Sequence, residues 1–270
     1  MLIVVKVGGK ILEDNISEIA DDVENLVLKD GHKVVFVHGG GVEVTNIARK
    51  LGKEQTFVTS PEGFRSRYTD EETIRIYNMV MSGEINKKIV LTLQSRGVQS
   101  VGLSGVDGAL LKAKKKEKII TVDEKGRKRV VDAGYSGKIC TVNIKLLKLL
   151  MENGFVPVVS PVAISEKFEF LNVDGDRTAA KIAGDLKADR LVLLTDVDGV
   201  ILNGKLVEKL KLSEIEEVIP KMGAGMSTKV HAAAEALNLG VEEAIIASGV
   251  RKSPVSLSIR HIGGTVITRG

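Results

Sequence analysis

A lysine beside a glycine-rich turn is the feature of this chain best suited to chemistry on phosphate. Lys6 interrupts the apolar run LIVVKV (2–7) directly before Gly8 and Gly9. Burying an unpaired ammonium group is costly, so a lysine in such a strand favours an anionic partner. Glycine-rich turns after a strand let backbone N–H groups approach an anion. We therefore predict that Lys6 neutralises phosphate charge; the alternative is a solvated lysine at an exposed strand end.

A second lysine and two aspartates occur at other predicted helix starts. Lys229 follows the run GAGM, where its charge opposes the positive end of the helix dipole, and an anion between it and Lys6 would remove that conflict. Asp174 and Asp176, in LNVDGDRTAA, are either functional carboxylates or simple helix-capping residues. The chain has no GxxxxGK[ST] motif, and no GxGxxG follows the first strand, which excludes a P-loop and a dinucleotide fingerprint.

Strands and helices alternate along the chain and would position these residues. The predicted strands are 2–7, 33–37, 98–103, 155–164, 189–195, 242–248 and the closing GTVITRG. Helical spacing is found in the stretches between them, including one from about Asp70 with Ile74, Tyr77, Met81 and Ile85 on one face. This alternation predicts an α/β fold with a parallel-rich sheet covered on both faces. Ligands of such sheets bind beyond the carboxyl ends of the strands, where the glycine-rich turns lie.

Composition limits the class of protein. The chain has 270 residues, of which 43% are hydrophobic and 27% charged, enough for one large domain or two lobes that share a sheet. A single cysteine, Cys140, rules out an internal disulfide and fits a reducing compartment. No apolar run is long enough to span a membrane, and His32, His231 and His261 lack metal-ligand spacing. We expect a cytoplasmic protein without a membrane or metal site.

The segment LLKAKKKEKIITVDEKGRKRVV, residues 110–131, concentrates positive charge. Between Lys112 and Arg129 it contains nine basic residues against three acidic ones, whereas the whole chain carries a net charge of only +4. The flanks of DEKG predict a β-hairpin. A solvated charged surface is one explanation. A nucleic-acid site is disfavoured because no aromatic residues are interleaved with the basic ones.

Taken together, KVGG, HGGG, LNVDGDRTAA, LTDVDGV and MGAGMSTKVHAA resemble the amino acid kinase family, within it the N-acetylglutamate kinase branch. The resemblance implies a single domain, 1–270, folded as a three-layer αβα sandwich with a mainly parallel central sheet. Residues 1–170, with a basic hairpin at 110–136, would bind the acceptor, and residues 171–270 would bind ATP with Mg²⁺ as co-substrate. It implies transfer of the γ-phosphoryl group to a side-chain carboxylate, giving an acyl phosphate, and no tightly bound cofactor.

The resemblance assigns roles to individual residues. Lys6 and Lys229 match the catalytic lysines, and Asp176 matches the aspartate that orients them. The substrate-binding positions are Gly40, Gly41, Arg67 and Asn172. The ATP-binding positions are Gly8, Gly9, Thr195, Asp196, Val197, Met222, Gly225 and Met226. A carboxylate is already a nucleophile, so positioning and charge neutralisation are what such a site must supply.

The acceptor segment GFRSRYTDEET (63–73) is similar to the branch that acts on α-aminoadipate attached to the amino-group carrier protein LysW. That branch implies lysine biosynthesis, with LysW-bound glutamate as a second acceptor in an arginine or ornithine route. Arg67 keeps its spacing to Thr69 and Asp70 and matches the arginine that grips the α-carboxylate, while Arg65 stays open as a second contact. Two alternatives remain: a kinase of free N-acetylglutamate, and a non-catalytic nucleotide-binding regulator.

The resemblance also implies partners. LysW-type carriers are small acidic proteins whose C-terminal glutamate holds the substrate by its α-amino group, so a basic hairpin would steer the carrier to the cleft. The proposed docking residues are Lys114, Lys115, Lys116, Arg127 and Lys128. Because the chain starts at the first strand, without the N-terminal helix that makes some acetylglutamate kinases hexameric, we expect a homodimer that binds no nucleic acid and no membrane.

Overall fold

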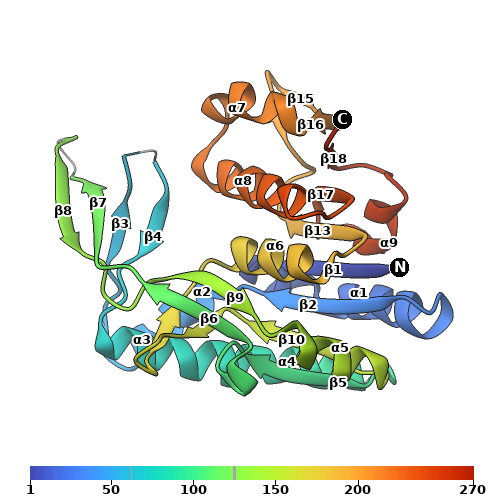
Figure 1. Cartoon of the computed structure of the whole chain (residues 1–270), viewed down its shortest axis with the longest axis horizontal. Coiled ribbons are helices and arrows are strands. Elements are labelled where there is room, and N and C mark those ends of the chain that lie inside the picture. The colour runs from blue at the N-terminus through green and yellow to red at the C-terminus, as the bar shows by residue number, and fades with distance from the viewer. Residues whose placement is uncertain (62, 124–125) are drawn as a thin grey trace.

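An eight-stranded, mainly parallel sheet forms the centre of the molecule (Figure 1). The computed structural model describes residues 1–61, 63–123 and 126–270. The strands of this sheet are β1 (Leu2–Val7), β2 (Lys33–His38), β5 (Ser100–Ser104), β10 (Val156–Ser160), β13 (Arg190–Thr195), β16 (Lys209–Lys211), β17 (Glu243–Ser248) and β18 (Thr265–Thr268). Their order is β16-β18-β17-β13-β1-β2-β10-β5. The closing strand β18 runs antiparallel to β17, and all strands from β17 to β5 run parallel.

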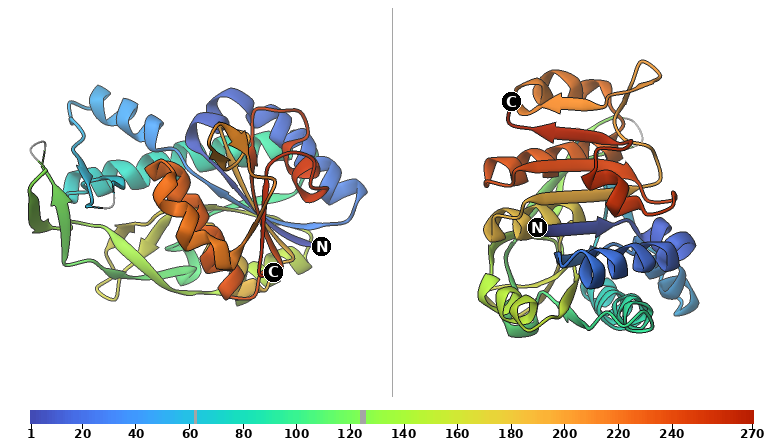
Figure 2. Two further views of the ribbon diagram at one scale, coloured as in Figure 1. Left: turned by 90° about the horizontal axis from the view of Figure 1, so that it is seen from above. Right: turned by 90° about the vertical axis from the view of Figure 1, so that its right-hand side faces the viewer.

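Helices cover both faces of this sheet, as Figure 2 shows from two further directions. They are α1 (Gly9–Glu24), α2 (Gly41–Lys50), α3 (Glu71–Asn78), α4 (Asn86–Gln94), α5 (Ile144–Glu152), α6 (Gly175–Leu186), α7 (Ile215–Val218), α8 (Ala224–Asn238) and α9 (Pro254–Ile259). Alternate residues of β1 enter different cores: Val5 packs in the core that contains Ile19 of α1, and Val4 in the core that contains Ala180 of α6 and Ala233 of α8. The predicted three-layer αβα sandwich is confirmed.

The helical segment predicted from about Asp70 consists of α3, a π-helical stretch (Met79–Ile85) and α4. The Asp70 carboxylate caps α3 by accepting a hydrogen bond from the backbone N–H of Thr73, with an N···O distance of 2.8 Å. The predicted apolar face, namely Ile74, Tyr77, Met81 and Ile85, is buried. This long segment packs behind the glycine-rich turn at residues 39–41.

A smaller four-stranded sheet lies beside the main one. It has the order β12-β11-β6-β9 and consists of β6 (Leu111–Lys115), β9 (Gly137–Val142), β11 (Val162–Ile164) and β12 (Phe170–Asn172). The prediction of one strand over 155–164 is wrong, because the chain bends at Pro161, so that β10 belongs to the main sheet and β11 to the smaller one. A proline has no N–H to donate to a ladder, which suits it to such a break.

Two hairpins project side by side beyond the smaller sheet (Figure 1). They are formed by β3 (Phe57–Thr59) with β4 (Arg65–Arg67) and by β7 (Lys118–Val122) with β8 (Lys128–Asp132). A third pair, β14 (Ile201–Leu202) with β15 (Lys205–Leu206), lies in the C-terminal part. The basic segment is thus divided: β6 belongs to the four-stranded sheet, and β7 and β8 form the hairpin. Glu124 and Lys125, at the predicted turn, lie outside the described residues.

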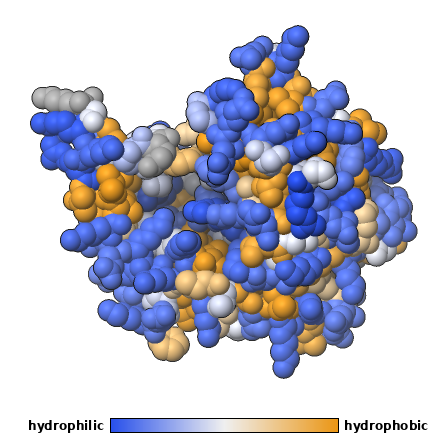
Figure 3. Space-filling view, turned by 45° about the horizontal axis from the view of Figure 1, so that its top comes forward, coloured by the Kyte–Doolittle hydropathy of each residue, from blue (hydrophilic) through white to orange (hydrophobic). Residues whose placement is uncertain are grey.

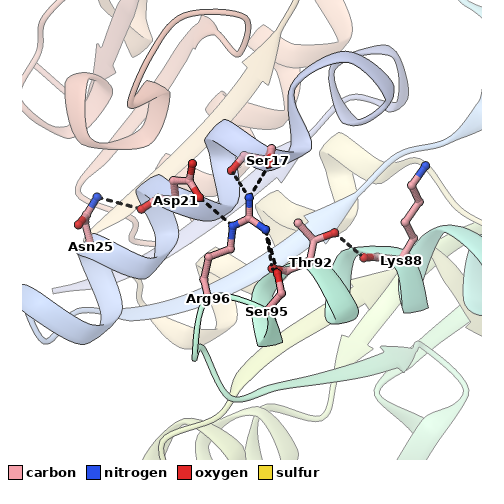
Figure 4. A network of polar contacts seen from close by, with 7 residues as sticks. All are labelled: Ser17, Asp21, Asn25, Lys88, Thr92, Ser95 and Arg96. Atoms are coloured by element: carbon pink, nitrogen blue, oxygen red, sulfur yellow. Dashed lines mark hydrogen bonds and ion pairs between the residues drawn. The ribbon is translucent and has the colours of Figure 1, made fainter.

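Polar contacts fix α1, whose first residue is Gly9, against its neighbours. Arg96, just beyond α4, donates from Nε to the Asp21 carboxylate at 2.7 Å and also contacts Ser17 (Figure 4). On the other side, the buried Asp22 carboxylate accepts from the backbone N–H groups of Val255 and Ser256 at the start of α9. These contacts fix the C-terminal half of α1 between α4 and α9. None of the described helices is long and apolar enough to cross a lipid bilayer.

Candidate active site

One buried carboxylate holds the two predicted catalytic lysines together. Lys6 lies near the carboxyl end of β1, and its Nζ atom is 2.7 Å from Oδ1 of Asp176 in the first turn of α6. Lys229, in α8, donates from Nζ to Oδ2 of the same carboxylate at 2.9 Å. Because α6 and α8 pack against each other, residues 53 positions apart in the sequence meet at one point. The group carries a net charge of +1 and can therefore attract an anion.

Burial and the neighbouring charges shift the pKa values of Asp176 and Lys6 in opposite directions. Burial alone would raise the pKa of Asp176, but Lys6 and Lys229 lower it to about 2. Burial likewise opposes charge on Lys6, and the ion pair with Asp176 more than offsets it, so that the pKa of Lys6 is raised. Burial and the neighbouring Asp176 raise the pKa of Asp174, whose carboxylate also caps α6. Lys6 therefore stays charged at neutral pH, as neutralisation of a phosphoryl group requires.

Two glycine-rich turns meet beside the lysines with no room for side chains. A Cβ atom on Gly9 would lie 2.8 Å from Cα of Gly40. A Cβ atom on Gly40, whose φ is 155°, would lie 2.1 Å from Cδ1 of Ile85. The turns are also joined to neighbouring strands, since Gly39 N–H donates to the Val7 carbonyl at 2.8 Å. Glycine is therefore required at both turns, and the exposed backbone that results is suited to contact with an anion.

A fully buried histidine and asparagine support the second turn. His38 Nδ1 hydrogen-bonds to the Gly39 carbonyl at 2.9 Å, and Asn86 Nδ2 lies 3.2 Å from His38 Nε2. Asn86 also donates to the carbonyl of Val158 in β10 at 2.9 Å, which ties the turn to the sheet. The Nδ1–H tautomer satisfies both contacts. Burial, with further contributions from Lys6 and Lys87, lowers the pKa of His38 to about 4, so the ring is neutral.

A cavity of about 710 Å³ opens in front of Asp176 and Lys6. Figure 3 shows the molecule hollowed between the projecting hairpins and the body of the protein. The structure brings these sequence-predicted residues into its lining: Lys6, Gly40, Gly41, Arg67, Lys116, Asn172 and Asp176. Tyr77 and Met81, which the sequence indicated only as an apolar helix face, line it as well. The predicted acceptor-binding positions therefore lie in one place.

The two candidate arginines differ in their surroundings. Arg67 is buried, and its guanidinium donates to the Gly41 carbonyl at 2.6 Å and to Thr45 Oγ1 at 2.9 Å. Arg65 is exposed and lies over the Phe57 ring, 4.5 Å from its centroid. Both line the cavity. Arg67 is thus fixed in direction by bonds to the glycine turn, which suits a carboxylate-binding residue better than a mobile side chain does.

The predicted ATP-binding residues lie outside this cavity. Thr195 and Asp196 are at the carboxyl end of β13, and Met222, Gly225 and Met226 are at or near the start of α8. Sequence reasoning missed Lys10, whose Nζ is 3.6 Å from an Asp196 carboxylate oxygen and which joins the start of α1 to this region. The lysine in KVGGK was a usable signal. Among the described residues no group of three or more His, Cys, Asp or Glu side chains could hold a metal ion.

Comparison with known sequences gives consistent matches. The model of the amino acid kinase family matches residues 1–248. The chain is 43% identical over 270 residues, covering 100% of both chains, to the LysW-aminoadipate/LysW-glutamate kinase of Saccharolobus solfataricus. It is 51% identical over 269 residues, again covering 100% of both chains, to a relative from Cenarchaeum symbiosum that carries the same name in provisional form.

Solved structures share the fold at lower identity. The N-acetylglutamate synthase of Neisseria gonorrhoeae superposes with a TM-score of 0.82 at 23% identity, covering 100% of this chain and 59% of that one. The carbamate kinase of Giardia lamblia superposes with a TM-score of 0.69 at 19% identity, covering 99% and 98% of the two chains. At such identities the likeness concerns the fold alone.

The neutral His38 ring predicts a loss of stability in mild acid. Its pKa is about 4 in the folded chain and near 6.5 when unfolded, so the unfolded state binds the proton first. The free energy of unfolding should fall by about 3 kcal/mol between pH 6.5 and 4 on this account. Urea unfolding at several pH values should show a shallower pH dependence for His38→Gln than for wild type. The matched control is His231→Gln, at an exposed position, and equal slopes for the two variants would contradict the assignment.

Proposed function

The chain belongs to the amino acid kinase family, and we propose that its acceptor is an amino acid carried on a protein. It is a phosphotransferase with a carboxyl group as acceptor and ATP as co-substrate. We propose L-2-aminoadipate bound to LysW as the acceptor, with LysW-bound L-glutamate as a second one, in lysine and arginine biosynthesis. The proposal is supported above all by full-length identity of 43% to the Saccharolobus LysW-aminoadipate/LysW-glutamate kinase.

The geometry of the site supports a direct transfer. An oxygen of the acceptor's side-chain carboxylate would attack the γ-phosphorus of ATP, while the bond from that phosphorus to the bridging oxygen breaks and ADP leaves. No general base is needed, because the carboxylate is already ionised. Lys6 and Lys229 would neutralise the charge spread over the phosphoryl oxygens, and Asp176 would hold the two ammonium groups at a fixed separation.

The remaining predicted residues fit around this reaction. We propose that Arg67 grips the α-carboxylate and that Asn172, which donates to Thr69 Oγ1 at 3.1 Å, lies at the amide of the attached acceptor. Residues 1–170 would supply most of the acceptor side and residues 171–270 the nucleotide side. Mg²⁺ would arrive bound to the ATP phosphates, as this ion commonly does. We assign the reaction to the cytoplasm, a compartment in keeping with the free Cys140 thiol.

The hairpin of β7 and β8 is the proposed docking surface for the acidic carrier. Ile120 and Val130 are directly opposite each other across the strands, and both are exposed. Lys118 and Lys128 lie on the same face of the hairpin by strand alternation, and both are exposed. An apolar pair flanked by lysines matches a protein partner with acidic residues better than it matches a solvated surface.

Two of the five predicted docking residues are already engaged within the chain. Lys115 pairs with Glu169 at 2.9 Å and lies 3.9 Å from the Tyr135 ring centroid. Arg127 pairs with Asp123 at 3.0 Å. Docking on the hairpin would therefore rest most on Lys128, and Lys116 belongs to the cavity instead.

We also propose a homodimer formed at the β5 edge of the main sheet. Among the strands that the structure describes, β5 pairs only with β10. The flanking helices α4 and α5 cover opposite faces, and each exposes a leucine: Leu91 with 67% and Leu149 with 56% of its surface accessible. Exposed apolar side chains on both sides of a sheet edge suit a self-complementary interface.

The choice of acceptor distinguishes the proposed function from its main alternative, a kinase of free N-acetylglutamate. Purified enzyme with ATP and Mg²⁺ should form acyl phosphate, trapped as hydroxamate, with LysW-bound aminoadipate. It should phosphorylate free N-acetylglutamate at least about 100-fold less efficiently, as kcat/KM, because the free molecule lacks the carrier contacts. Lys6→Ala provides the inactive control. Efficient use of free N-acetylglutamate would refute the carrier requirement, and an active Lys6→Ala enzyme would refute the site.

Removal of positive charge from the hairpin should weaken carrier docking alone. For Lys118→Ala/Lys128→Ala we expect the apparent KM for LysW-bound acceptor to rise about 3- to 10-fold, with less sensitivity to salt, because rim charges act mainly through association. The KM for ATP should stay unchanged. Lys33→Ala/Lys145→Ala, at exposed positions remote from the hairpin in sequence, has the same net charge and serves as the control. An unchanged acceptor KM would show that the hairpin charge has no docking role.

The dimer can be tested by its mass. Light scattering at micromolar concentration should give twice the 29.0 kDa chain mass for wild type. Leu91→Glu should shift the mass to that of one chain, because it places a charge in an apolar interface. Leu51→Glu, an exposed leucine on another helix end, should leave the mass unchanged. A wild-type mass of one chain would refute the proposal.

A further inference from the structure

The helical segment behind the second glycine-rich turn places two side chains in one wall of the acceptor cavity. Tyr77, in the last turn of α3, and Met81, in the π-helical stretch that follows, both line the cavity. They are otherwise buried, with 6% and 1% of their surfaces accessible. Met81 lies against the turn itself, since its Sδ atom would be 3.0 Å from a Cβ atom placed on Gly40. The transfer of the phosphoryl group uses neither side chain.

The Tyr77 hydroxyl is a buried polar group without a partner. Within residues 1–61, 63–123 and 126–270 it forms no hydrogen bond. Buried phenolic hydroxyls are normally paired, because an unpaired one costs free energy. The hydroxyl oxygen is not sealed within the protein and the side chain lines the cavity, so a bound ligand can be its partner. Burial raises the pKa of this hydroxyl, which therefore keeps its proton at neutral pH and can donate it in a hydrogen bond.

Arg67 is a second donor near this hydroxyl. Each of the two groups affects the pKa of the other, which shows that they interact electrostatically. Arg67 is buried, and in the described part of the chain its guanidinium donates only to uncharged groups. Burial accordingly lowers the pKa of Arg67. A buried cation and a buried hydroxyl donor that meet no carboxylate of the chain itself fit a ligand with a carboxylate.

An acceptor in the cavity would be held at both ends by fixed groups. Arg67 is tied to the Gly41 carbonyl at 2.6 Å, and Lys6 is tied to Asp176 at 2.7 Å. The two proposed acceptors, glutamate and aminoadipate, have the same two carboxylates but differ by one methylene in the chain between them. Because both ends are fixed, the longer chain has to bend, and the wall of the cavity has to make room for it.

Met81 is the part of this wall that can yield. The adjacent Ser82 holds the helical segment to the main sheet, since its hydroxyl oxygen is 2.9 Å from that of Ser160 at the end of β10. The backbone of the wall is therefore fixed, and only side chains can adapt to a longer or shorter acceptor. Methionine is unbranched and flexible, so that it fills spaces of different shape at little cost.

We propose that Tyr77 and Met81 select the acceptor: the Tyr77 hydroxyl donates to the acceptor's α-carboxylate beside Arg67, and the Met81 side chain makes room for a methylene chain of either length. The inference rests on the proposed function and deepens it, because it names the residues that decide which carried acid is phosphorylated. Both are binding residues and take no part in the making or breaking of a bond. The size of the side chain at position 81 then sets the preference between the two acceptors.

The test compares two acceptors on one carrier. LysW loaded with aminoadipate and LysW loaded with glutamate present the same docking surface, so the ratio of their kcat/KM values reports on the acceptor alone. Met81→Val enlarges the cavity and should raise the ratio of aminoadipate to glutamate about 10-fold, and Met81→Phe should lower it by a similar factor, the low end of what one methylene is worth in an apolar pocket. Met79→Val and Met79→Phe, at a position that is 56% exposed and outside the cavity lining, should leave the ratio unchanged.

The hydroxyl is tested by Tyr77→Phe, which keeps the ring. This variant should raise the KM for both loaded carriers about 10- to 100-fold, the range for a hydrogen bond to a charged group. The ratio between the two acceptors and the KM for ATP should stay at their wild-type values. Tyr68→Phe removes the same atom outside the cavity lining and is the matched control.

The possible results separate this proposal from the proposed function. An acceptor ratio that stays constant at position 81, or an unchanged acceptor KM in Tyr77→Phe, would overturn the selection by these residues and leave the kinase assignment intact. Met81→Val only removes atoms, so it decides the question if Met81→Phe does not fold. Wild-type enzyme that phosphorylates neither loaded carrier would refute the proposed function. Calorimetric binding of the two loaded carriers must then show the same shifts in the ratio of Kd values, and no binding of either would overturn both proposals.

Discussion

The structure depends on a single buried carboxylate that holds two ammonium groups together. Lys6 would not be stable as a cation so deep in the protein without Asp176, because an unpaired buried charge costs several kcal/mol. Asp176 in turn keeps its own charge only because both lysines contact it. The arrangement leaves one positive charge uncompensated at a fixed place, and that excess is what a phosphoryl group in transfer requires.

The fold supplies this arrangement by bringing together elements from distant parts of the chain. β1 delivers Lys6 from the centre of the sheet, while α6 and α8 approach from one face with Asp176 and Lys229. The two glycine-rich turns lie beside the lysines. Gly9 and Gly40 approach each other so closely that no side chain would fit between them. His38 and Asn86 hold the second turn from behind. These contacts hold the backbone N–H groups of the glycine-rich turns in a fixed position, where water would otherwise compete for an anion.

The sequence allowed the catalytic lysine to be predicted more readily than the residues that surround the site. Lys6 was recognisable because an ammonium group in an apolar strand needs a partner, and the strand–helix alternation predicted the central sheet. The break at Pro161 was missed, since a continuous apolar run does not reveal that the two halves enter different sheets. Lys138 and Arg177 carried no local signal. Their place in the cavity lining follows from the pairing of β6 with β9 and from the position of α6, which only tertiary structure determines.

The charges of the basic segment fall into two groups, one on the exposed hairpin and one at the cavity. Charges at the tip of an exposed hairpin act through solvent, where screening limits them to steering an approaching partner. Charges in the wall of a cavity act over short distances in a medium of lower dielectric constant, where they can discriminate between one acceptor and another. Lys128 and Lys116 are only twelve positions apart, yet Lys128 lies on the projecting hairpin and Lys116 lines the cavity. A run of basic residues that looks uniform in sequence is therefore divided by the fold between an exposed hairpin and the lining of the cavity.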